Sequence, residues 1–372
     1  MTGLMTAAVY YGPGDVRIEM VDRPERRQGE AMIRVVRSGM CGTDATEWRT
    51  GPLTFPVNRV HPVTGHTGPM IPGHEFIGEI LDIDEESDLS VGDLVASGAG
   101  VWCGECARCL EGRTNLCSTY YTLGLNIAGG MAEFASVPVK NLVRVPHGMS
   151  PDVAGLAQPL AVGLHAARRA GVSSGDRVII IGAGAIGTFV LAGLLSLGDA
   201  DITVVDFPGK RLERSARVGA TRVVPAGEGA ASDIDAAIGA GGADVVIEAS
   251  GATGQLANAL SLVRVGGRVL QVGLPSADQP INVHSFVMRE VTIDSTLAHV
   301  CDADLAPALQ ILATTSLAAE LLDSVNPLSA LPSLLDDLAH GRIEGKVLFD
   351  PSLPMDATLR ADGGTTTKGV TA

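Results

Sequence analysis

The feature that most limits how this chain can fold lies near its middle, at residues 177–195, RVIIIGAGAIGTFVLAGLL. Its first part, VIII, is a run of β-branched side chains without polar alternation, as in a strand buried on both faces of a parallel sheet. GAGAIG follows directly and predicts a tight turn into a helix. In a G-x-G-x-x-G turn the first glycine permits the turn, the second lets backbone approach a pyrophosphate, and the third lets helix pack on strand. We therefore expect a dinucleotide at Gly182, Gly184 and Gly187, where the helix N-terminus presents free N–H groups.

The sequence beyond the turn favours one dinucleotide over the other. Residues 202–205, ITVV, predict a second buried strand, and Asp206 stands at its end. There a carboxylate can accept hydrogen bonds from the adenosine ribose hydroxyls. A 2′-phosphate would meet this negative charge, so NAD is favoured over NADP, although Lys210 lies close by. Three further residues are expected to contact the cofactor: Ile186, Arg211 and Val272.

Two other interpretations of this stretch are weaker. The glycines could form a purely structural turn, and the uncharged residues 178–195 could cross a membrane. Three glycines within six positions suit a turn better than a membrane helix, and the chain has no comparable second apolar segment.

Length and composition agree with a chain of two domains whose partner is a small molecule. The chain has 372 residues, 46% of them hydrophobic, which is enough for substantial cores. Its net charge of −15 argues against nucleic-acid and membrane partners, because phosphate surfaces attract clustered Lys and Arg. The N-terminus lacks a basic start followed by an apolar stretch, so we expect a cytoplasmic location.

Four of the six cysteines fall within one short segment, residues 101–117. They are spaced three, three and eight positions apart, so one loop could wrap four thiolates around a tetrahedral ion. The alternative is two disulfides, which a reducing cytoplasm disfavours. The sequence therefore predicts a closed structural zinc site with these ligands: Cys103, Cys106, Cys109 and Cys117.

A second set of metal-competent residues precedes this loop. Cys41 follows a strand predicted at residues 30–38, with the hydroxyl of Thr43 two positions on, and PGHE supplies His74 and Glu75 beside a turn. Three protein ligands and one open position are what a catalytic zinc needs. Taken alone, the cysteine and the histidine could equally be buried structural residues.

Strand and helix signals divide the chain into two parts. Short strands and turns up to about residue 146 predict a β-rich, barrel-like domain. A helix at residues 152–170, interrupted at Pro159, leads into alternating strands and helices typical of a doubly wound parallel sheet. The fold class is therefore α/β. Residues 354–372 are poor in apolar side chains and are expected to be a disordered tail.

These motifs together resemble those of zinc-dependent medium-chain dehydrogenases/reductases, over the chain up to about residue 351. Within that superfamily the sequence is similar to the sorbitol, threonine and butanediol dehydrogenase branch, and residues 51–75 are similar to butanediol dehydrogenases. Besides the four-cysteine loop, four pieces carry the resemblance: CGTD at 41–44, GHEFIGE at 73–79, QPLAVGLHAARRAGV at 158–172 and GAGAIG at 182–187.

The resemblance implies the domain organisation and the roles of the site residues. A GroES-like catalytic domain is expected from residues 1–157, completed by residues 299–353, with a Rossmann NAD-binding domain at residues 158–298 inserted between. Each chain is expected to bind NAD and two zinc ions, one catalytic and one structural, and to form homodimers or homotetramers. Cys41 and His74 would ligate the catalytic zinc, Glu75 would be a direct or interchangeable ligand, and Thr43 would supply the hydroxyl next to the alcohol.

Two positions depart from the family pattern. Gln158 stands where relatives of this branch mostly have a glutamate, and an amide can hold a water or a hydroxyl but supplies no negative charge. Thr46 stands where a histidine often completes the proton relay, so the relay could end in the ribose and water or pass through Glu47.

The sequence thus predicts an NAD-dependent zinc dehydrogenase that interconverts a secondary alcohol, vicinal diol or polyol with a ketone. An epimerase or lyase that uses transient oxidation on the same scaffold is the alternative, because both departures lie where protons are handled. A catalytically silent NAD-binding protein is a third possibility, against which the intact Cys41, Thr43 and His74 argue.

Overall fold

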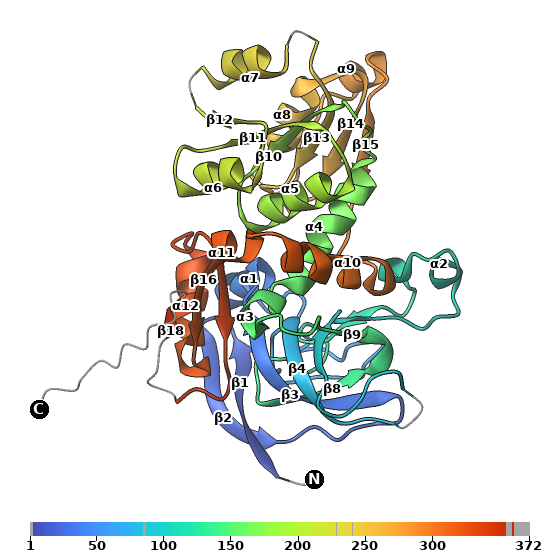
Figure 1. Cartoon of the computed structure of the whole chain (residues 1–372), viewed down its shortest axis with the longest axis vertical. Helices are drawn as coiled ribbons and strands as arrows, with labels where there is room; N and C mark the ends of the chain where they lie inside the picture. The colour runs from blue at the N-terminus through green and yellow to red at the C-terminus, as the bar shows by residue number, and fades with distance from the viewer. Residues whose placement is uncertain (1–2, 85–86, 228, 240, 355–358, 361–372) are drawn as a thin grey trace, which may run out of the picture. The chain divides into compact units, whose positions relative to one another are not determined.

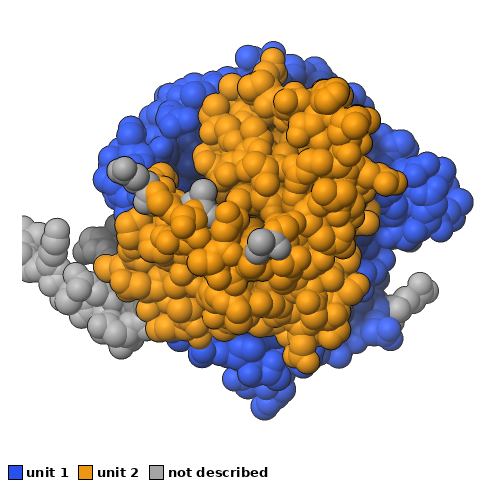
Figure 2. All heavy atoms as spheres, turned by 90° about the horizontal axis from the view of Figure 1, so that it is seen from above, with its two compact units in different colours: residues 1–158, 300–372 blue, residues 159–299 orange. Residues whose placement is uncertain are grey.

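The computed structural model describes residues 3–84, 87–227, 229–239, 241–354 and 359–360, and it divides into two compact units. Unit 1 comprises Met1–Gln158 and Val300–Ala372, and unit 2 comprises Pro159–His299 (Figure 2). None of the described helices is long and apolar enough to cross a membrane.

Unit 2 is built on a six-stranded sheet in the order β12-β11-β10-β13-β14-β15, with every neighbouring pair parallel (Figure 1). The strand order reverses direction beside β10, as in a doubly wound sheet, so this part of the fold prediction is confirmed. The strands are β10 (Arg177–Ile181), β11 (Asp201–Asp206), β12 (Arg222–Pro225), β13 (Ala243–Glu248), β14 (Val263–Gln271) and β15 (Thr292–Ser295). The helices are α5 (Ala185–Leu197), α6 (Lys210–Val218), α7 (Ala230–Ile238), α8 (Gln255–Leu262) and α9 (Val283–Met288), while α4 (Ala157–Ala170) begins at the boundary of the units.

The apolar run of β10 is explained by two cores, one on each face of the sheet. Val178 and Ile180 pack with side chains of α4, α5 and α6. Ile179 and Ile181 pack with side chains of α7 and α8. Each such buried side chain stabilises the fold by roughly 1.5–3 kcal/mol, which holds the following glycine turn at a rigid sheet edge.

Unit 1 contains an eight-stranded sheet in the order β18-β16-β17-β3-β4-β5-β9, with β8 also paired to β3, and two small sheets, β1-β2 and β6-β7. The strands are β1 (Leu4–Gly12), β2 (Asp15–Asp22), β3 (Glu30–Gly39), β4 (Glu75–Asp82), β5 (Leu94–Ser97), β6 (Gly100–Val101), β7 (Tyr121–Thr122), β8 (Phe134–Pro138), β9 (Leu142–Arg144), β16 (Leu322–Asn326), β17 (Lys346–Phe349) and β18 (Leu359–Arg360). The α-helices are α1 (Gly42–Thr50), α2 (Ala107–Leu110), α3 (Pro151–Ala154), α10 (Cys301–Thr314), α11 (Leu317–Leu321) and α12 (Leu331–Ala339). Short 3₁₀ turns occupy Thr114–Leu116, Val139–Asn141 and Leu328–Ala330.

The C-terminal segment completes the sheet of unit 1. β17 pairs antiparallel with β3, with Leu348 opposite Gly39. The half-buried guanidinium of Arg37 on β3 joins Asp152 at 2.6 Å and Asp350 at 2.7 Å, which ties three distant segments together. This pairing brings the start of β17 beside the end of β3, from which Cys41 follows.

The structure bears on two further expectations from the sequence, the helix at residues 152–170 and the C-terminal tail. The helix expected at residues 152–170 divides at Gly155, not at Pro159. Pro159 is the third residue of α4, where its missing N–H costs no helical hydrogen bond, so the predicted interruption there is wrong. The expected disordered tail falls mostly outside the described residues, apart from Pro354 and β18, which pairs with β16.

Candidate active site

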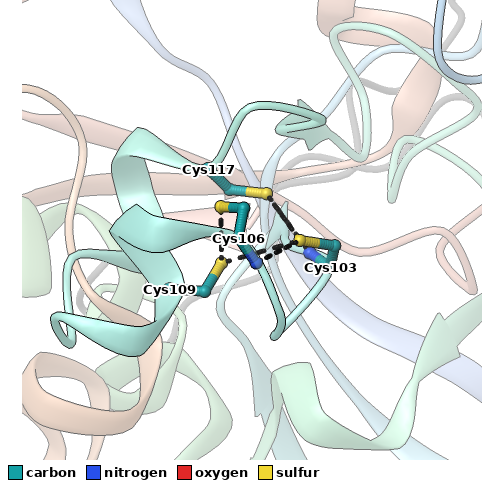
Figure 3. Close-up of side chains that lie close together, drawn as sticks. All are labelled: Cys103, Cys106, Cys109 and Cys117. Carbon is teal, nitrogen blue, oxygen red and sulfur yellow. Dashed lines mark hydrogen bonds between the residues drawn. The ribbon is translucent and has the colours of Figure 1, made fainter.

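The four cysteines of the loop between β6 and β7 converge on one point (Figure 3). Their Sγ atoms lie 3.5 Å apart in the pairs Cys106–Cys109 and Cys117–Cys103, and 3.9 Å apart between Cys103 and Cys109. A tetrahedral zinc with bonds of about 2.3 Å places its sulfurs about 3.8 Å apart, so the cluster fits the ion. All six cysteines are free thiols in the structure, as a metal site requires.

Backbone N–H groups around the loop favour thiolates. The N–H groups of Cys106 and Glu105 donate to Cys103 Sγ at 3.4 and 3.5 Å, and that of Cys103 donates to Cys117 Sγ at 3.3 Å. Backbone hydrogen bonds from Ser118 and Cys109 lower the pKa of the Cys106 thiol to about 5, whereas burial raises the pKa of the Cys109 thiol to about 12. Clustered thiolates need a cation between them, as a structural zinc would supply.

The second predicted ligand set also comes together. Cys41 is the N-cap of α1, and His74 and Glu75 stand at the start of β4. Their candidate ligand atoms all lie within 4.8 Å of one another. His74 and Glu75 are only 6% and 2% exposed, and Cys41 is partly exposed. A thiolate, an imidazole and a carboxylate gathered at one partly open point fit a catalytic zinc.

Asp44 supports this set from α1. Its Oδ2 accepts the backbone N–H of Cys41 at 2.9 Å, and its Oδ1 lies 3.7 Å from Nδ1 of His74. Among the described residues neither Oδ1 nor Nδ1 has a hydrogen-bond partner. At 3.7 Å the carboxylate attracts the ring electrostatically from the Nδ1 side without a hydrogen bond, and it leaves the other nitrogen for a metal. This role of Asp44 was not among the expectations from the sequence, although an acid at the third position after an N-cap residue is a recognisable capping signal.

Lys346 is a further residue that the sequence did not reveal. Its ammonium group forms a buried ion pair with Glu75 and donates to the carbonyl of Met40 at 2.7 Å. Burial lowers the pKa of Lys346, but the charges of Glu75 and Cys41 outweigh burial and raise it above its ordinary value. The lysine therefore stays charged beside the metal ligands.

The imidazole of His74 lies among the same negatively charged groups. Burial opposes its protonation, but Asp44, Cys41 and Glu75 outweigh burial and raise its pKa to about 10. A metal ligand must be the neutral imidazole, so zinc binding has to displace this proton.

The remaining predicted catalytic residues differ in their surroundings. Thr43 Oγ1 lies 4.0 Å from Cys41 Sγ. Thr46 is exposed and donates its hydroxyl to the carbonyl of Gly42 at 2.9 Å, a bond that must break before it can relay a proton. Gln158 is buried in the first turn of α4. Glu47, considered as a relay, is buried and holds backbone N–H groups instead.

The glycine turn of unit 2 has the backbone that a dinucleotide requires. Gly182 has a φ of 105°, and a Cβ on Gly187 would lie 1.9 Å from the carbonyl oxygen of Gly182. Gly184 is the N-cap of α5. Asp206 ends β11, and its carboxylate accepts the N–H of Ala183 at 2.6 Å and that of Phe207 at 2.7 Å. The other expected contacts are Ile186 in α5, Arg211 in α6 and Val272 directly after β14.

Comparison with known proteins agrees with this geometry. Residues 27–147 match the family model of the alcohol dehydrogenase GroES-like domain, and residues 185–314 match that of the zinc-binding dehydrogenase domain. The chain is 31% identical to erythritol/L-threitol dehydrogenase of Mycolicibacterium smegmatis, over 94% of this chain and 98% of that protein. It is 31% identical to (R,R)-butanediol dehydrogenase of Bacillus subtilis, over 90% of this chain and 94% of that protein. The crystal structure of 2R,3R-butanediol dehydrogenase from Bacillus subtilis superposes with a TM-score of 0.84 at 28% identity, covering 94% of this chain and 100% of the other.

Proposed function

The chain belongs to the zinc-type alcohol dehydrogenases, with a GroES-like domain and a zinc-binding dehydrogenase domain, and we propose that it reversibly oxidises a secondary alcohol, vicinal diol or polyol to a ketone with NAD. The observation that carries the proposal is the convergence of Cys41, His74 and Glu75. The same chain carries a dinucleotide turn at the carboxyl end of a parallel strand, so it has parts for both reactants.

We assign metal binding and proton handling to the chain's own residues. Cys41, His74 and Glu75 would hold zinc, with Asp44 orienting the histidine and Lys346 balancing the charge of Glu75. When bound, zinc supplies a Lewis acid for the hydroxyl oxygen, and NAD supplies the hydride acceptor. We assign to the hydroxyl of Thr43, 4.0 Å from Cys41 Sγ, the relay of the alcohol's proton: it would accept that proton and release its own hydroxyl proton to water.

NAD is proposed over NADP because of Asp206. Its carboxylate lies at the end of β11, where Oδ2 accepts the N–H of Ala183 in the glycine turn and Oδ1 accepts the N–H of Phe207. A second negative charge in the form of a 2′-phosphate would be repelled there, whereas ribose hydroxyls can still donate to the carboxylate.

Two finer features are part of the proposal. The two ligand sets support two zinc ions per chain, one in the closed four-thiolate loop and one in the open set around Cys41. The relatives named above act, by their names, on erythritol, threitol and butanediol, so we propose a vicinal diol or polyol as substrate. Assembly as a homodimer or homotetramer is proposed from the family resemblance.

A substrate screen tests the function. Vicinal diols, polyols and simple secondary alcohols are incubated with NAD or NADP, with NADH formation followed by absorbance and products analysed in parallel. We expect NADH formation with at least one diol or polyol and weaker activity with NADP. Conversion of a substrate without net NADH formation would contradict the proposal and favour the epimerase or lyase alternative.

A further inference from the structure

Glu47, on α1, carries a carboxylate that is buried at 1% exposure in unit 1. Its Oε2 accepts the backbone N–H of Leu53 at 2.9 Å, and its Oε1 accepts those of Thr54 and, at 3.3 Å, Phe55. Three successive N–H groups therefore converge on one carboxylate, the concave arrangement that peptides use to bind anions. The segment of residues 53–55, here called the clamped turn, is held back onto α1.

The clamped turn is held from its other side as well. Arg59 donates to the carbonyls of Leu53 and Thr54 at 2.5 and 3.2 Å. A Cβ on Gly51 would lie 2.4 Å from Glu47 Oε2, so glycine is required where the chain leaves α1. The N–H groups of the clamped turn are thus bound by a carboxylate and its carbonyl groups by a guanidinium, and together these contacts fix its backbone.

The clamped turn carries Phe55, which lines the same small cavity as Asp44 of the proposed zinc site. The ring of Phe55 is buried and meets Tyr10 edge to face, with ring centroids 4.9 Å apart. Phe55, Tyr10 and Asp44 line the same cavity of about 10 Å³, together with Pro72 and Met131. That volume is no more than a single water needs, so the surroundings of Asp44 are closely packed. The packed wall keeps the Asp44 carboxylate in position 3.7 Å from His74 Nδ1.

We propose that Glu47 is a positioning residue of the zinc site: through the clamped turn it holds Phe55 in the wall of the cavity that Asp44 also lines, which keeps the His74 ligand oriented and slows zinc release. Both ends of one short helix then serve the site, with Cys41 at its start and Glu47 near its end. The inference rests on the zinc site of the proposed function. It replaces the idea that Glu47 relays protons, because the carboxylate is already engaged by backbone donors.

The test is the rate of zinc release from the purified wild-type protein and from Glu47→Gln, followed with a chromogenic chelator. Glutamine keeps the volume but sets an NH₂ donor against a backbone N–H of the clamped turn. We expect a fast phase from the open site and a slow phase from the four-cysteine loop, with Cys41→Ser lacking the fast phase. Glu47→Gln should quicken the fast phase about tenfold, as expected when an outer ligand support is lost, and leave the slow phase unchanged.

Leu142→Ala controls for a general loss of stability. Leu142 belongs to a hydrophobic cluster of unit 1 distinct from that of Phe55, so its truncation destabilises the unit without touching the clamped turn. This variant should release zinc like the wild type, and an equally faster fast phase would overturn the proposal. An unchanged fast phase in Glu47→Gln would overturn it too, while a wild-type protein without a fast phase would overturn the proposed function itself.

Phe55→Leu keeps the inference testable if Glu47→Gln does not fold. It preserves the carboxylate and its N–H partners but removes the ring packed near Asp44. The fast phase should again be quicker than in the wild type, and an unchanged rate would contradict the role assigned to the clamped turn.

Discussion

Replacing Lys346 with methionine removes one partner of the buried ion pair beside the proposed zinc site. The side chains of Lys346 and Glu75 are 6% and 2% exposed, so almost no water remains to solvate a lone carboxylate. Breaking a buried pair by deleting one partner typically costs about 3–5 kcal/mol, because the other charge stays buried and uncompensated. The carbonyl of Met40 also loses its donor, which adds about 1 kcal/mol.

Zinc should reverse part of this cost. A cation bound by Cys41, His74 and Glu75 compensates the same carboxylate, and the variant no longer places a positive charge next to the metal. We therefore expect Lys346→Met to lose about 4–6 kcal/mol of unfolding free energy with the open site metal-free, and distinctly less with that site loaded. By thermodynamic linkage, the variant should bind zinc at least about tenfold more tightly, the equivalent of about 1.4 kcal/mol.

Urea unfolding with and without zinc in the open site measures the free energy of unfolding. Chelator competition measures the zinc affinity. The double variant Lys346→Met, Glu75→Gln is the control, because it removes both charges and should recover most of the metal-free stability. A cost below about 1 kcal/mol in metal-free Lys346→Met, or weaker zinc binding by that variant, would refute the reasoning.

Three further predictions concern the structural zinc, the cofactor and the polar residue at the start of α4. Cys106→Ser should lower the melting temperature and remove about one zinc while leaving substrate KM nearly unchanged, since a closed site contributes folding energy; a stable, metal-replete variant would contradict it. Asp206→Ser should raise the ratio of kcat/KM for NADP over NAD about tenfold or more, because it relieves charge repulsion. It should also weaken NADH binding, because the N–H of Ala183 loses its acceptor. A wild-type preference for NADP would contradict this prediction. Gln158→Glu should raise the apparent pKa in the pH profile of kcat/KM for oxidation, because an added carboxylate near the alcohol opposes loss of its proton; an unchanged or lowered value would place Gln158 outside the site.

Local patterns in the sequence were enough to predict the parts of the site that depend on neighbouring residues. The strand, turn and helix around Gly182 follow from apolar runs and glycine spacing, and the structure confirms them as β10 and α5. The four-cysteine cluster needs only one short loop to close. Cys41 and His74 each belong to a short motif beside a strand, so both could be predicted from the sequence as candidate metal ligands.

Contacts between distant segments were not predictable in this way. Lys346 and Glu75 are 271 positions apart in the sequence and come into contact because β17 pairs with β3. No local sequence pattern predicts the register of that strand pair. Glu47 shows the opposite limit, since its residue type favoured proton transfer whereas its burial and its three backbone partners give it a structural task. Residue type states what a side chain can do, and only the fold determines which partners it meets.

The most direct test of the central claim compares the wild-type protein with Cys41→Ser in zinc content and NADH formation. We expect about two zinc ions and NADH formation from a diol or polyol for the wild type. For the variant we expect about one zinc, unchanged NADH binding and no NADH formation, because only the open ligand set is broken. Undiminished NADH formation by Cys41→Ser, with one zinc lost, would contradict the claim that oxidation takes place at this site.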